Sequence, residues 1–391
     1  MFRKENRKTS PFAATARLVL AVGVVFAVLA APAFGQHVHQ LFYDDNAWAD
    51  TDLTAAGGGL NARAYSLAAF YTQGDQLHVY YVSEYELHIH QLYNNGTSWT
   101  DEDLTTLTGG MTALSAQISG FQIGGAQYLY FCGNDNVVHE YTYGNNGDFN
   151  WVDNALPTGN TQGSCGGDVV AVVTSPNNQR HVYYTAQSST ETAPLRQLYF
   201  NGFTWQNQAF SSLLEGAKKA QVGSWLSAFA VNNDQYVFFQ GPGQTLYMYS
   251  YVDNWAITNI TDAAGAPKMG ARLNGVAAFA VPGTSQMEVY YAAAKTNDVQ
   301  QATFVNGAWT DEDLTAQAGG SGPVEFSQIT ALSTPGNFHV YLTEDHDVFQ
   351  LYFNGSDWAN QGLPSASATV TATASFAIGN DQYVYYISGV N

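Results

Sequence analysis

The sequence predicts an all-β fold, a seven-bladed β-propeller of four-stranded antiparallel blades closed by its N- and C-terminal strands. A strand, a turn and a tryptophan recur along the chain at Trp48, Trp99, Trp151, Trp205, Trp255, Trp309 and Trp358. Each repeat of about fifty residues holds four short runs rich in β-branched and aromatic residues. Four-stranded units repeated four to eight times are typical of propellers, which leave few exposed strand edges.

The second repeat shows the four expected strands clearly. They cover residues 65–71, 76–82, 87–94 and 98–103, and short polar turns containing Gly74, Glu84 and Gly96 separate them. Such alternation of strand-forming runs and turn residues is the ordinary signal of hairpins. Helical periodicity is almost absent, and residues 213–220 form the only short helix that we expect.

The two ends of the repeat array complement each other. The array starts at a third strand, and residues 375–387 supply a first and a second strand with no third or fourth. We therefore expect residues 37–53 and 375–387 to share one blade. Opening the ring would then break a ladder of strand hydrogen bonds.

Residues 1–35 have the features of a signal peptide. Five basic residues precede an uncharged apolar stretch over residues 18–31, and Ala33 and Gly35 occupy the −3 and −1 positions of a cleavage site. Fourteen apolar residues are fewer than the ~20 that a membrane-spanning helix needs, although an uncleaved anchor is the alternative. We expect a mature protein of residues 36–391, a single propeller domain without a membrane span, that is secreted or periplasmic.

The charge excludes several classes of partner. The chain has 13 basic and 32 acidic residues, a net charge of −19, and the leader holds five of the basic ones. Because such an acidic surface repels phosphate backbones and other polyanions, we expect no nucleic-acid binding. With 25 Tyr, 22 Phe and 8 Trp, the chain has the composition of a packed protein.

No motif predicts catalysis or a cofactor. The sequence has no nucleophile elbow, no His-Glu-x-x-His zinc motif and no glycine-rich phosphate loop. We expect no catalytic residues and no cofactor. Because several repeats are close copies, several equivalent binding sites are a better expectation than one active centre.

Two residue patterns raise the question of metal binding. The acidic triplets 101–103 and 311–313, with Asp50 and Asp52, are candidate calcium ligands, but a solvated outer strand is the favoured interpretation. Histidines recur on third strands, and alternate ones such as His88 and His90 share a strand face, which is compatible with zinc. No cysteine or carboxylate recurs with them in the sequence, so we expect no metal site.

A recurring set of polar and aromatic residues fits a neutral sugar. A second-strand histidine, a third-strand glutamine and a tryptophan eight residues later offer hydrogen bonds for hydroxyls and an apolar ring for a sugar's C–H face. The candidate sugar-binding residues are His78, Gln91, Trp99, His181, Gln197, Trp205, His339, Gln350, Trp358, Gln40, Trp48, Gln301 and Trp309. The alternative is that the aromatic residues fill the core between blades while His and Gln satisfy backbone groups.

The only two cysteines, Cys132 and Cys165, are expected near the same face of the ring, one at the end of a second strand and one in a connection between blades. A disulfide between adjacent blades is therefore possible, and an exported protein would permit it. Two free thiols are the alternative.

These motifs resemble the repeats of β-propeller fucose-binding lectins, which include six-bladed fungal and seven-bladed bacterial members. The resemblance rests on Leu77-His78-Val79-Tyr80-Tyr81, on His88-Ile89-His90-Gln91-Leu92-Tyr93, and on the turn Asn354-Gly355-Ser356-Asp357-Trp358. It implies sugar pockets between adjacent blades, built in the fungal type from a second-strand arginine, a third-strand glutamate and aromatic residues of the neighbouring blade.

This chain departs from the fungal pattern at both polar positions. The arginine position holds His78, Tyr128, His181, Tyr236, Glu288, His339 and Tyr383. The glutamate position holds, in the same order, Gln91, Glu140, Gln197, Met248, Gln301, Gln350 and Gln40. We expect the units with Met248 or Glu288 to bind weakly.

The expected function is that of a secreted multivalent lectin for neutral glycans, with fucose as the candidate sugar. A propeller scaffold for protein partners is the main alternative, and a glycan-cleaving enzyme is the weaker one.

Overall fold

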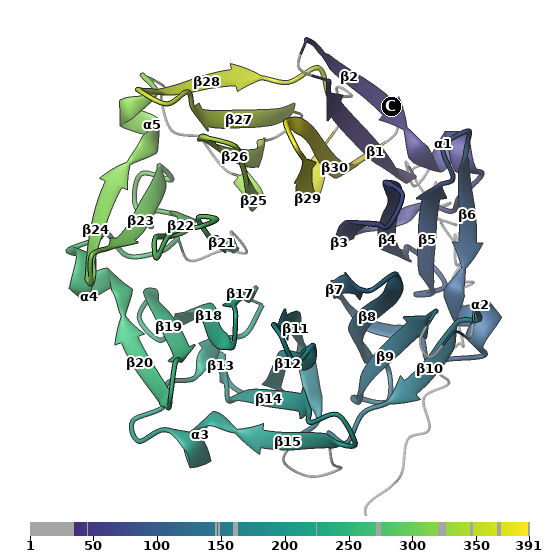
Figure 1. Ribbon diagram of the computed structural model, residues 1–391, viewed down its shortest axis with the longest axis horizontal. Helices are drawn as coiled ribbons and strands as arrows, with labels where there is room; N and C mark the ends of the chain where they lie inside the picture. The colour runs from purple at the N-terminus through teal and green to yellow at the C-terminus, as the bar shows by residue number, and fades with distance from the viewer. Residues whose placement is uncertain are drawn as a thin grey trace, which may run out of the picture. The chain divides into compact units, whose positions relative to one another are not determined.

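The computed structural model describes residues 35–44, 46–144, 147, 149–158, 163–223, 225–270, 275–319, 326–344, 347–365 and 369–389. They form seven four-stranded antiparallel sheets arranged as blades around a central axis, as Figure 1 shows. The predicted seven-bladed propeller is confirmed. The predicted signal peptide lies outside the described residues, apart from Gly35.

The blades follow one another along the chain. Blade 1 consists of β3 (Ala62–Thr72), β4 (Gln76–Ser83), β5 (Ile89–Asn94) and β6 (Trp99–Asp103). Blade 2 consists of β7 (Ala113–Ile123), β8 (Ala126–Gly133), β9 (Val138–Tyr143) and β10 (Val152–Ala155). Blade 3 consists of β11 (Cys165–Thr174), β12 (Gln179–Ala186), β14 (Leu195–Phe200) and β15 (Trp205–Ala209). A two-stranded sheet of β13 (Thr192–Ala193) and β16 (Ala220–Gln221) lies outside the blades.

Three further blades repeat the same order. Blade 4 consists of β17 (Ser227–Val231), β18 (Asp234–Gly241), β19 (Thr245–Tyr251) and β20 (Trp255–Asn259). Blade 5 consists of β21 (Val276–Ala280), β22 (Met287–Ala292), β23 (Val299–Val305) and β24 (Ala308–Asp313). Blade 6 consists of β25 (Phe326–Thr334), β26 (Asn337–Glu344), β27 (Asp347–Phe353) and β28 (Trp358–Gly362).

Blade 7 contains strands from both ends of the chain. It is formed by β29 (Val370–Ile378), β30 (Asp381–Gly389), β1 (Gln36–Tyr43) and β2 (Trp48–Asp52), in that spatial order. β1 pairs antiparallel with β30 over its full length, from Gln36 opposite Gly389 to Tyr43 opposite Gln382. The shared blade predicted from residues 37–53 and 375–387 is therefore confirmed.

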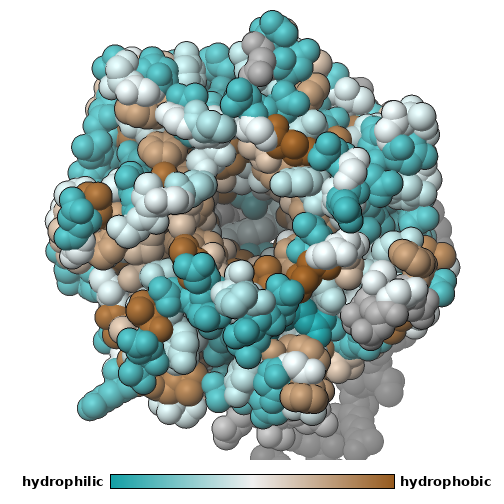
Figure 2. Space-filling view, viewed as in Figure 1, coloured by the Kyte–Doolittle hydropathy of each residue, from teal (hydrophilic) through white to brown (hydrophobic). Residues whose placement is uncertain are grey.

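The first strands of all seven blades line a central channel, which Figure 2 shows as an opening in the face of the ring. Side chains of one first strand satisfy backbone groups of the next. Gln117 Oε1 accepts from the Val169 amide at 2.9 Å, and Gln328 Oε1 accepts from the Thr373 amide at 2.9 Å. These bonds fix neighbouring blades in register at the axis, where no strand ladder connects them.

The core lies between the blades. One buried cluster combines Phe70 and Tyr80 of blade 1 with Leu129 and Phe131 of blade 2. Six other clusters join the remaining neighbours in the same way, and second-strand tyrosines such as Tyr184, Tyr291 and Tyr386 are fully buried in them. Packing between blades is therefore the main apolar burial of this fold, at roughly 25 cal/mol per Å².

Five short helices among the described residues directly follow fourth strands: α1 (Leu53–Gly57), α2 (Leu104–Thr108), α3 (Phe210–Leu213), α4 (Ile260–Ala264) and α5 (Leu314–Gln317). The helix predicted over residues 213–220 is wrong, because α3 ends at Leu213. No helix of the described part of the chain has the length and apolar character needed to cross a membrane.

Four of these five helices are capped by the last residue of the preceding fourth strand. Asp103 Oδ1 accepts a hydrogen bond from the Thr106 amide at 2.8 Å and caps α2, while Gly109 ends it in the left-handed conformation with φ 61°. The buried Leu104 anchors the helix, and Thr105 Oγ1 accepts from the Ile89 amide at 2.9 Å. Equivalent caps are formed by Asp52, Asn259 and Asp313. Helix-capping residues favour this geometry even in helices too short to show periodicity.

The cysteines of blades 2 and 3 are bonded. Cys132 lies in β8 and Cys165 begins β11, and a disulfide joins them with 5.8 Å between their Cα atoms. Both belong to the buried cluster between these two blades. The covalent bond therefore links two sheets that otherwise contact each other only through side chains and loops.

Candidate functional site between adjacent blades

Each blade presents two chemically different faces. Successive side chains of a strand point to opposite sides of a sheet, so Tyr80 of β4 packs against blade 2 while Tyr81 packs against blade 7. Gln91 lies opposite Tyr80 in the ladder, and His90 lies opposite Tyr81. We call the side of Tyr80 and Gln91 the glutamine face and the side of Tyr81 and His90 the histidine face.

The glutamine face of blade 1 carries a buried polar network. The Gln91 amide nitrogen lies 3.3 Å from the Tyr80 hydroxyl and 3.3 Å from Gln127 Oε1, and it also contacts His78 Nδ1. The Tyr80 hydroxyl donates to Gln127 Oε1. Since Gln127 belongs to β8 of blade 2, the network joins the two blades.

The same network recurs at two other interfaces. In blade 3 the Gln197 amide nitrogen lies 2.9 Å from His181 Nδ1 and 3.1 Å from Gln235 Oε1 of blade 4. In blade 6 the Gln350 amide nitrogen lies 2.9 Å from His339 Nδ1 and 3.0 Å from Gln382 Oε1 of blade 7. The three blades predicted to carry complete sets therefore share one geometry.

The histidines of this network are neutral. Burial lowers the pKa of His78, His181 and His339 to about 4 in each case. With Nδ1 accepting from the glutamine amide, Nε2 carries the proton and donates to Thr72 Oγ1 in blade 1 and to Thr334 Oγ1 in blade 6, both at 3.0 Å. The site therefore offers uncharged hydrogen-bonding groups near neutral pH.

The other interfaces are variations of the network. Gln301 of blade 5 donates to Glu288 Oε2 at 2.7 Å, and burial raises the pKa of Glu288. Gln40 of blade 7 donates to the Tyr385 hydroxyl at 3.2 Å. In blade 4 the corresponding residues, Met248 and Phe238, are apolar and buried. The side chains that could donate or accept hydrogen bonds to a ligand thus differ from one interface to the next.

A pocket of about 450 Å³ lies over the network between blades 1 and 2. Its polar lining comes from Gln76, His78, Gln91, Glu102, Gln127 and Asn150, and its apolar lining comes from Tyr93, Leu107, Tyr143, Phe149 and Trp151. Phe149 is 73% exposed and Leu107 is 60% exposed, so two large apolar side chains are available to a ligand. Amides from both blades converge beside aromatic rings, as in sites for small polar ligands.

Tryptophans of the fourth strands pack against second-strand tyrosines of the preceding blade. Trp151 of blade 2 packs edge-on against Tyr80 at 6.2 Å, Trp255 of blade 4 against Tyr183 at 6.2 Å, and Trp48 of blade 7 against Tyr341 at 6.1 Å. Trp205 and Trp358 contact Tyr130 and Tyr290 in the same manner. Trp99 packs in the cluster between blades 7 and 1, and Trp309 in that between blades 4 and 5.

The structure places Trp99 away from His78 and Gln91, and a tryptophan of the neighbouring blade accompanies them instead, as pockets between blades allow. Gln91 lies opposite Glu102 in the ladder, three residues from Trp99. An odd separation along a strand puts the two side chains on opposite faces. The sets that the fold brings together are His78 and Gln91 with Trp151, His181 and Gln197 with Trp255, and His339 and Gln350 with Trp48.

The interface of blades 2 and 3 contains an ion pair that the repeat pattern did not indicate. Arg180 Nη1 of β12 lies 2.7 Å from Glu140 Oε1 of β9, and both residues are buried. The guanidinium stacks over the rings of Tyr128, Phe200 and Trp205 at 4.4–5.1 Å. Arginine is thus absent from the expected position, but Arg180, one residue before His181, occupies this interface from the neighbouring blade.

The histidine faces pair imidazoles with aspartates of the fourth strands. His37 Nδ1 contacts Asp52 at 2.7 Å, His90 Nδ1 contacts Asp101 at 2.9 Å, and His139 Nδ1 contacts Asp153 at 2.7 Å. The expectation that no carboxylate recurs with these histidines is wrong. The partners lie on the adjacent strand, ten or more residues away, so that only strand pairing brings them together.

Comparisons with known proteins support the fold. Neither a family model nor a curated protein sequence matches the chain. It is similar to a triple arginine-to-alanine mutant of AofleA from Arthrobotrys oligospora, with 15% identity and a TM-score of 0.55 over 89% of this chain and 93% of that chain. It is also similar to the fucose-specific lectin from Aleuria aurantia, with 17% identity and a TM-score of 0.54 over 78% of this chain and 96% of that chain. The Aleuria lectin has six blades, whereas this protein has seven.

Proposed function

We propose that this protein is a non-enzymatic, multivalent lectin that binds neutral sugars in pockets between its blades. The observation that carries the proposal is the pocket between blades 1 and 2, where amide and imidazole groups from two blades meet exposed and half-buried aromatic rings. A sugar needs both kinds of group: hydrogen bonds fix its hydroxyls, and its C–H face packs on a ring. Similarity in fold to a fucose-specific lectin supports the same class of ligand.

The charge of the pocket favours uncharged sugars. Burial raises the pKa of Glu102, which lines the pocket, and neither Lys nor Arg is among the described lining residues. The neutral His78 adds no positive charge to attract a carboxylate or sulfate. Sialylated and sulfated glycans are therefore disfavoured, and fucose is the first candidate among neutral sugars.

Sugar binding is assigned to three interfaces between blades. They are those of blades 1 and 2, 3 and 4, and 6 and 7, which share the histidine, glutamine and tyrosine network and a tryptophan from the following blade. Arg180 occupies the interface of blades 2 and 3, and Met248 makes that of blades 4 and 5 apolar. Weak sites repeated on one rigid ring bind a glycan-coated surface with high avidity.

We further propose that residues 36–391 act as one exported domain after removal of the leader. A disulfide between Cys132 and Cys165 is compatible with an oxidising compartment. Mass spectrometry of the exported protein tests both points, since a retained leader or two free thiols would contradict them.

A glycan array followed by calorimetry with α-methyl-L-fucoside and α-methyl-D-galactoside tests the proposed function. We expect binding of a neutral sugar at micromolar to millimolar concentration and no release of product from the glycans that bind. If no neutral sugar binds at millimolar concentration, the lectin proposal is wrong and a protein-binding scaffold replaces it. Cleavage of a bound glycan would instead identify an enzyme.

A further inference from the structure

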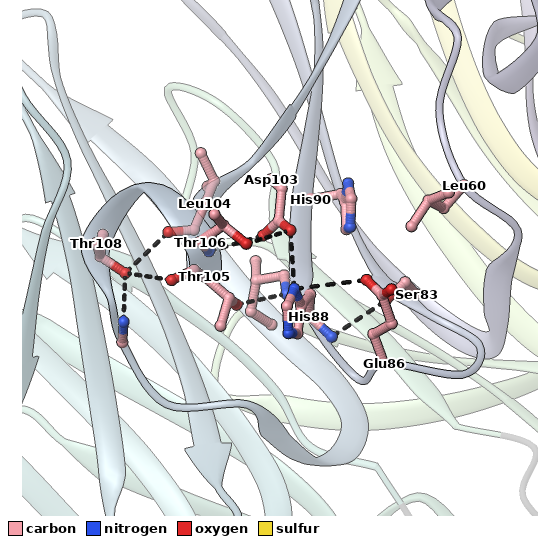
Figure 3. Close-up of polar contacts among 12 residues, drawn as sticks. Leu60, Ser83, Glu86, His88, His90, Asp103, Leu104, Thr105, Thr106 and Thr108 are labelled. Atoms are coloured by element: carbon pink, nitrogen blue, oxygen red, sulfur yellow. Dashed lines mark hydrogen bonds and ion pairs between the residues drawn. The ribbon is translucent and has the colours of Figure 1, made fainter.

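A compact group of metal-ligating side chains lies on the histidine face of blade 1, away from the proposed sugar pocket. Glu86 belongs to the turn between β4 and β5, His88 directly precedes β5, His90 is the second residue of β5, and Asp103 ends β6. One donor atom from each of the four residues lies within 4.8 Å of the others. Figure 3 shows the two imidazoles and the two carboxylates of this group together.

The closest contacts centre on His88. Its Nδ1 lies 2.8 Å from Asp103 Oδ2 and 3.7 Å from Glu86 Oε2. Two carboxylates thus face one imidazole nitrogen, so that a cation between them would replace the proton that now bridges His88 and Asp103. Asp103 uses its other oxygen, Oδ1, to cap α2, while Oδ2 accepts from Thr106 Oγ1 and faces His88, so that a metal would take the place of the His88 contact.

His90 supplies a second, independent observation. Its side chain is 3% exposed, and its Nδ1 lies 2.9 Å from Asp101 Oδ2. Because a carboxylate only accepts, Nδ1 carries the proton and Nε2 has a free lone pair. That buried Nε2 has no hydrogen-bond partner among the residues that the structure describes. An imidazole oriented by a carboxylate on one nitrogen, with the other nitrogen free, is the usual arrangement of a metal-bound histidine.

We propose that Glu86, His88, His90 and Asp103 bind one divalent transition-metal ion, with zinc as the metal that fits best. Two imidazole nitrogens and two carboxylate oxygens form the four-coordinate set that zinc accepts, at roughly 2.0–2.2 Å from each donor. Donors in such a tetrahedron lie roughly 3.3 Å apart, so Glu86 must move closer to His88, from 3.7 Å, while His88 and Asp103 open slightly from 2.8 Å. Glu86 is 55% exposed and can move inward without disturbing the core.

Four protein ligands leave no open position on a tetrahedral ion, so the metal would have a structural role. It would tie the turn before β5 to the end of β6 and the start of α2. Thr106 Oγ1 donates to Asp103 Oδ2 at 2.7 Å and would orient that ligand. The site is independent of sugar binding, because Gln91 and Trp151 lie on the other side of blade 1.

The internal repeats predict one ion per chain. Blade 7 repeats the two histidines and the capping aspartate as His37, His39 and Asp52, but glycine stands at position 35, where blade 1 has Glu86. In blade 2 a valine, Val137, replaces the first histidine. A complete set of four ligands therefore occurs in blade 1 among the blades with this pattern.

The experiment uses protein dialysed against a chelator and then titrated with zinc chloride by calorimetry, in the absence of sugar. We expect one equivalent to bind and to raise the melting temperature, and cobalt(II) to give the visible absorption of a four-coordinate site. Glu86→Gln should weaken zinc binding by about tenfold or more. His88→Gln should do the same. The matched controls are Glu215→Gln, which changes an exposed glutamate outside the group, and His37→Gln in blade 7, and both should bind as the parent does.

Glu86 is mostly exposed, so Glu86→Gln should fold normally, and its melting curve without metal serves as the check. Failure of the parent protein to bind zinc at micromolar concentration would overturn the proposal. Binding that Glu86→Gln and His88→Gln leave unchanged would also overturn it, since the ion would then lie elsewhere.

Discussion

Gln91→Met is the sharpest test of the proposed sugar site between blades 1 and 2. The substitution places in blade 1 the residue that blade 4 carries at the same position, Met248, which is buried and fits between two blades. It removes the amide that joins His78, Tyr80 and Gln127 across the interface. The Tyr80 hydroxyl keeps its bond to Gln127, so the packing of the two blades should survive.

The size of the effect follows from the lost hydrogen bond. A ligand hydroxyl or a site group left without its partner costs about 1–3 kcal/mol, which corresponds to a loss in affinity of about 5- to 150-fold at this site. In calorimetry with the best neutral sugar, the number of sites should fall from about three to about two per chain, because separate weak sites bind independently. The affinity of the remaining sites should not change.

Two controls make the result interpretable. The variant must show the circular dichroism spectrum and melting curve of the parent. The same change at a blade without the complete network, Gln40→Met, should leave the number of sites unchanged. If Gln91→Met binds sugar as the parent does, the glutamine is a structural residue and the assignment of the pocket fails.

Three further predictions follow from the packing of the blades. Trp151→Ala should lower the sugar affinity of the site between blades 1 and 2 about tenfold, whereas Trp99→Ala should leave that affinity unchanged. Equal losses of affinity for the two variants in calorimetry would contradict the pairing of each tryptophan with the preceding blade. Arg180→Ala should lower the free energy of unfolding by about 3–5 kcal/mol, because Glu140 would stay buried without its partner. In urea unfolding, the double variant with Glu140→Gln should regain part of that free energy. Stability should fall as the pH drops from about 6.5 to 4, because the unfolded chain then protonates His78, His181 and His339 while the folded chain keeps them neutral. Each histidine contributes up to about 3 kcal/mol to this loss. Burial raises the pKa of Asp168 and of Asp311 to about 6, and both oppose the loss because their folded forms bind a proton first. Urea midpoints that stay constant across this range would refute the assignment of three neutral buried histidines.

The sequence predicted the strands well because each one leaves a local signal. Alternating aromatic and β-branched residues identified β4 and β5 within two residues of their ends, and the recurring tryptophan fixed the length of the repeat. The short helices were missed because four or five residues are too few to show helical periodicity. The signal of α1, α2, α4 and α5 was a capping residue before Leu-Thr or Ile-Thr and a glycine after the helix, as in Asp103 and Gly109.

The sequence by itself determined the number of blades, the shared blade and the residue types at each position of the repeat. Only the tertiary structure decided which of those residues meet. Strand pairing put Trp99 on the opposite face from Gln91, and packing between blades brought Trp151 to Gln91 and Arg180 to Glu140. Hydrophobic period and turn signals are properties of neighbouring residues, whereas a site between blades depends on the twist and spacing of two sheets, which no single repeat encodes.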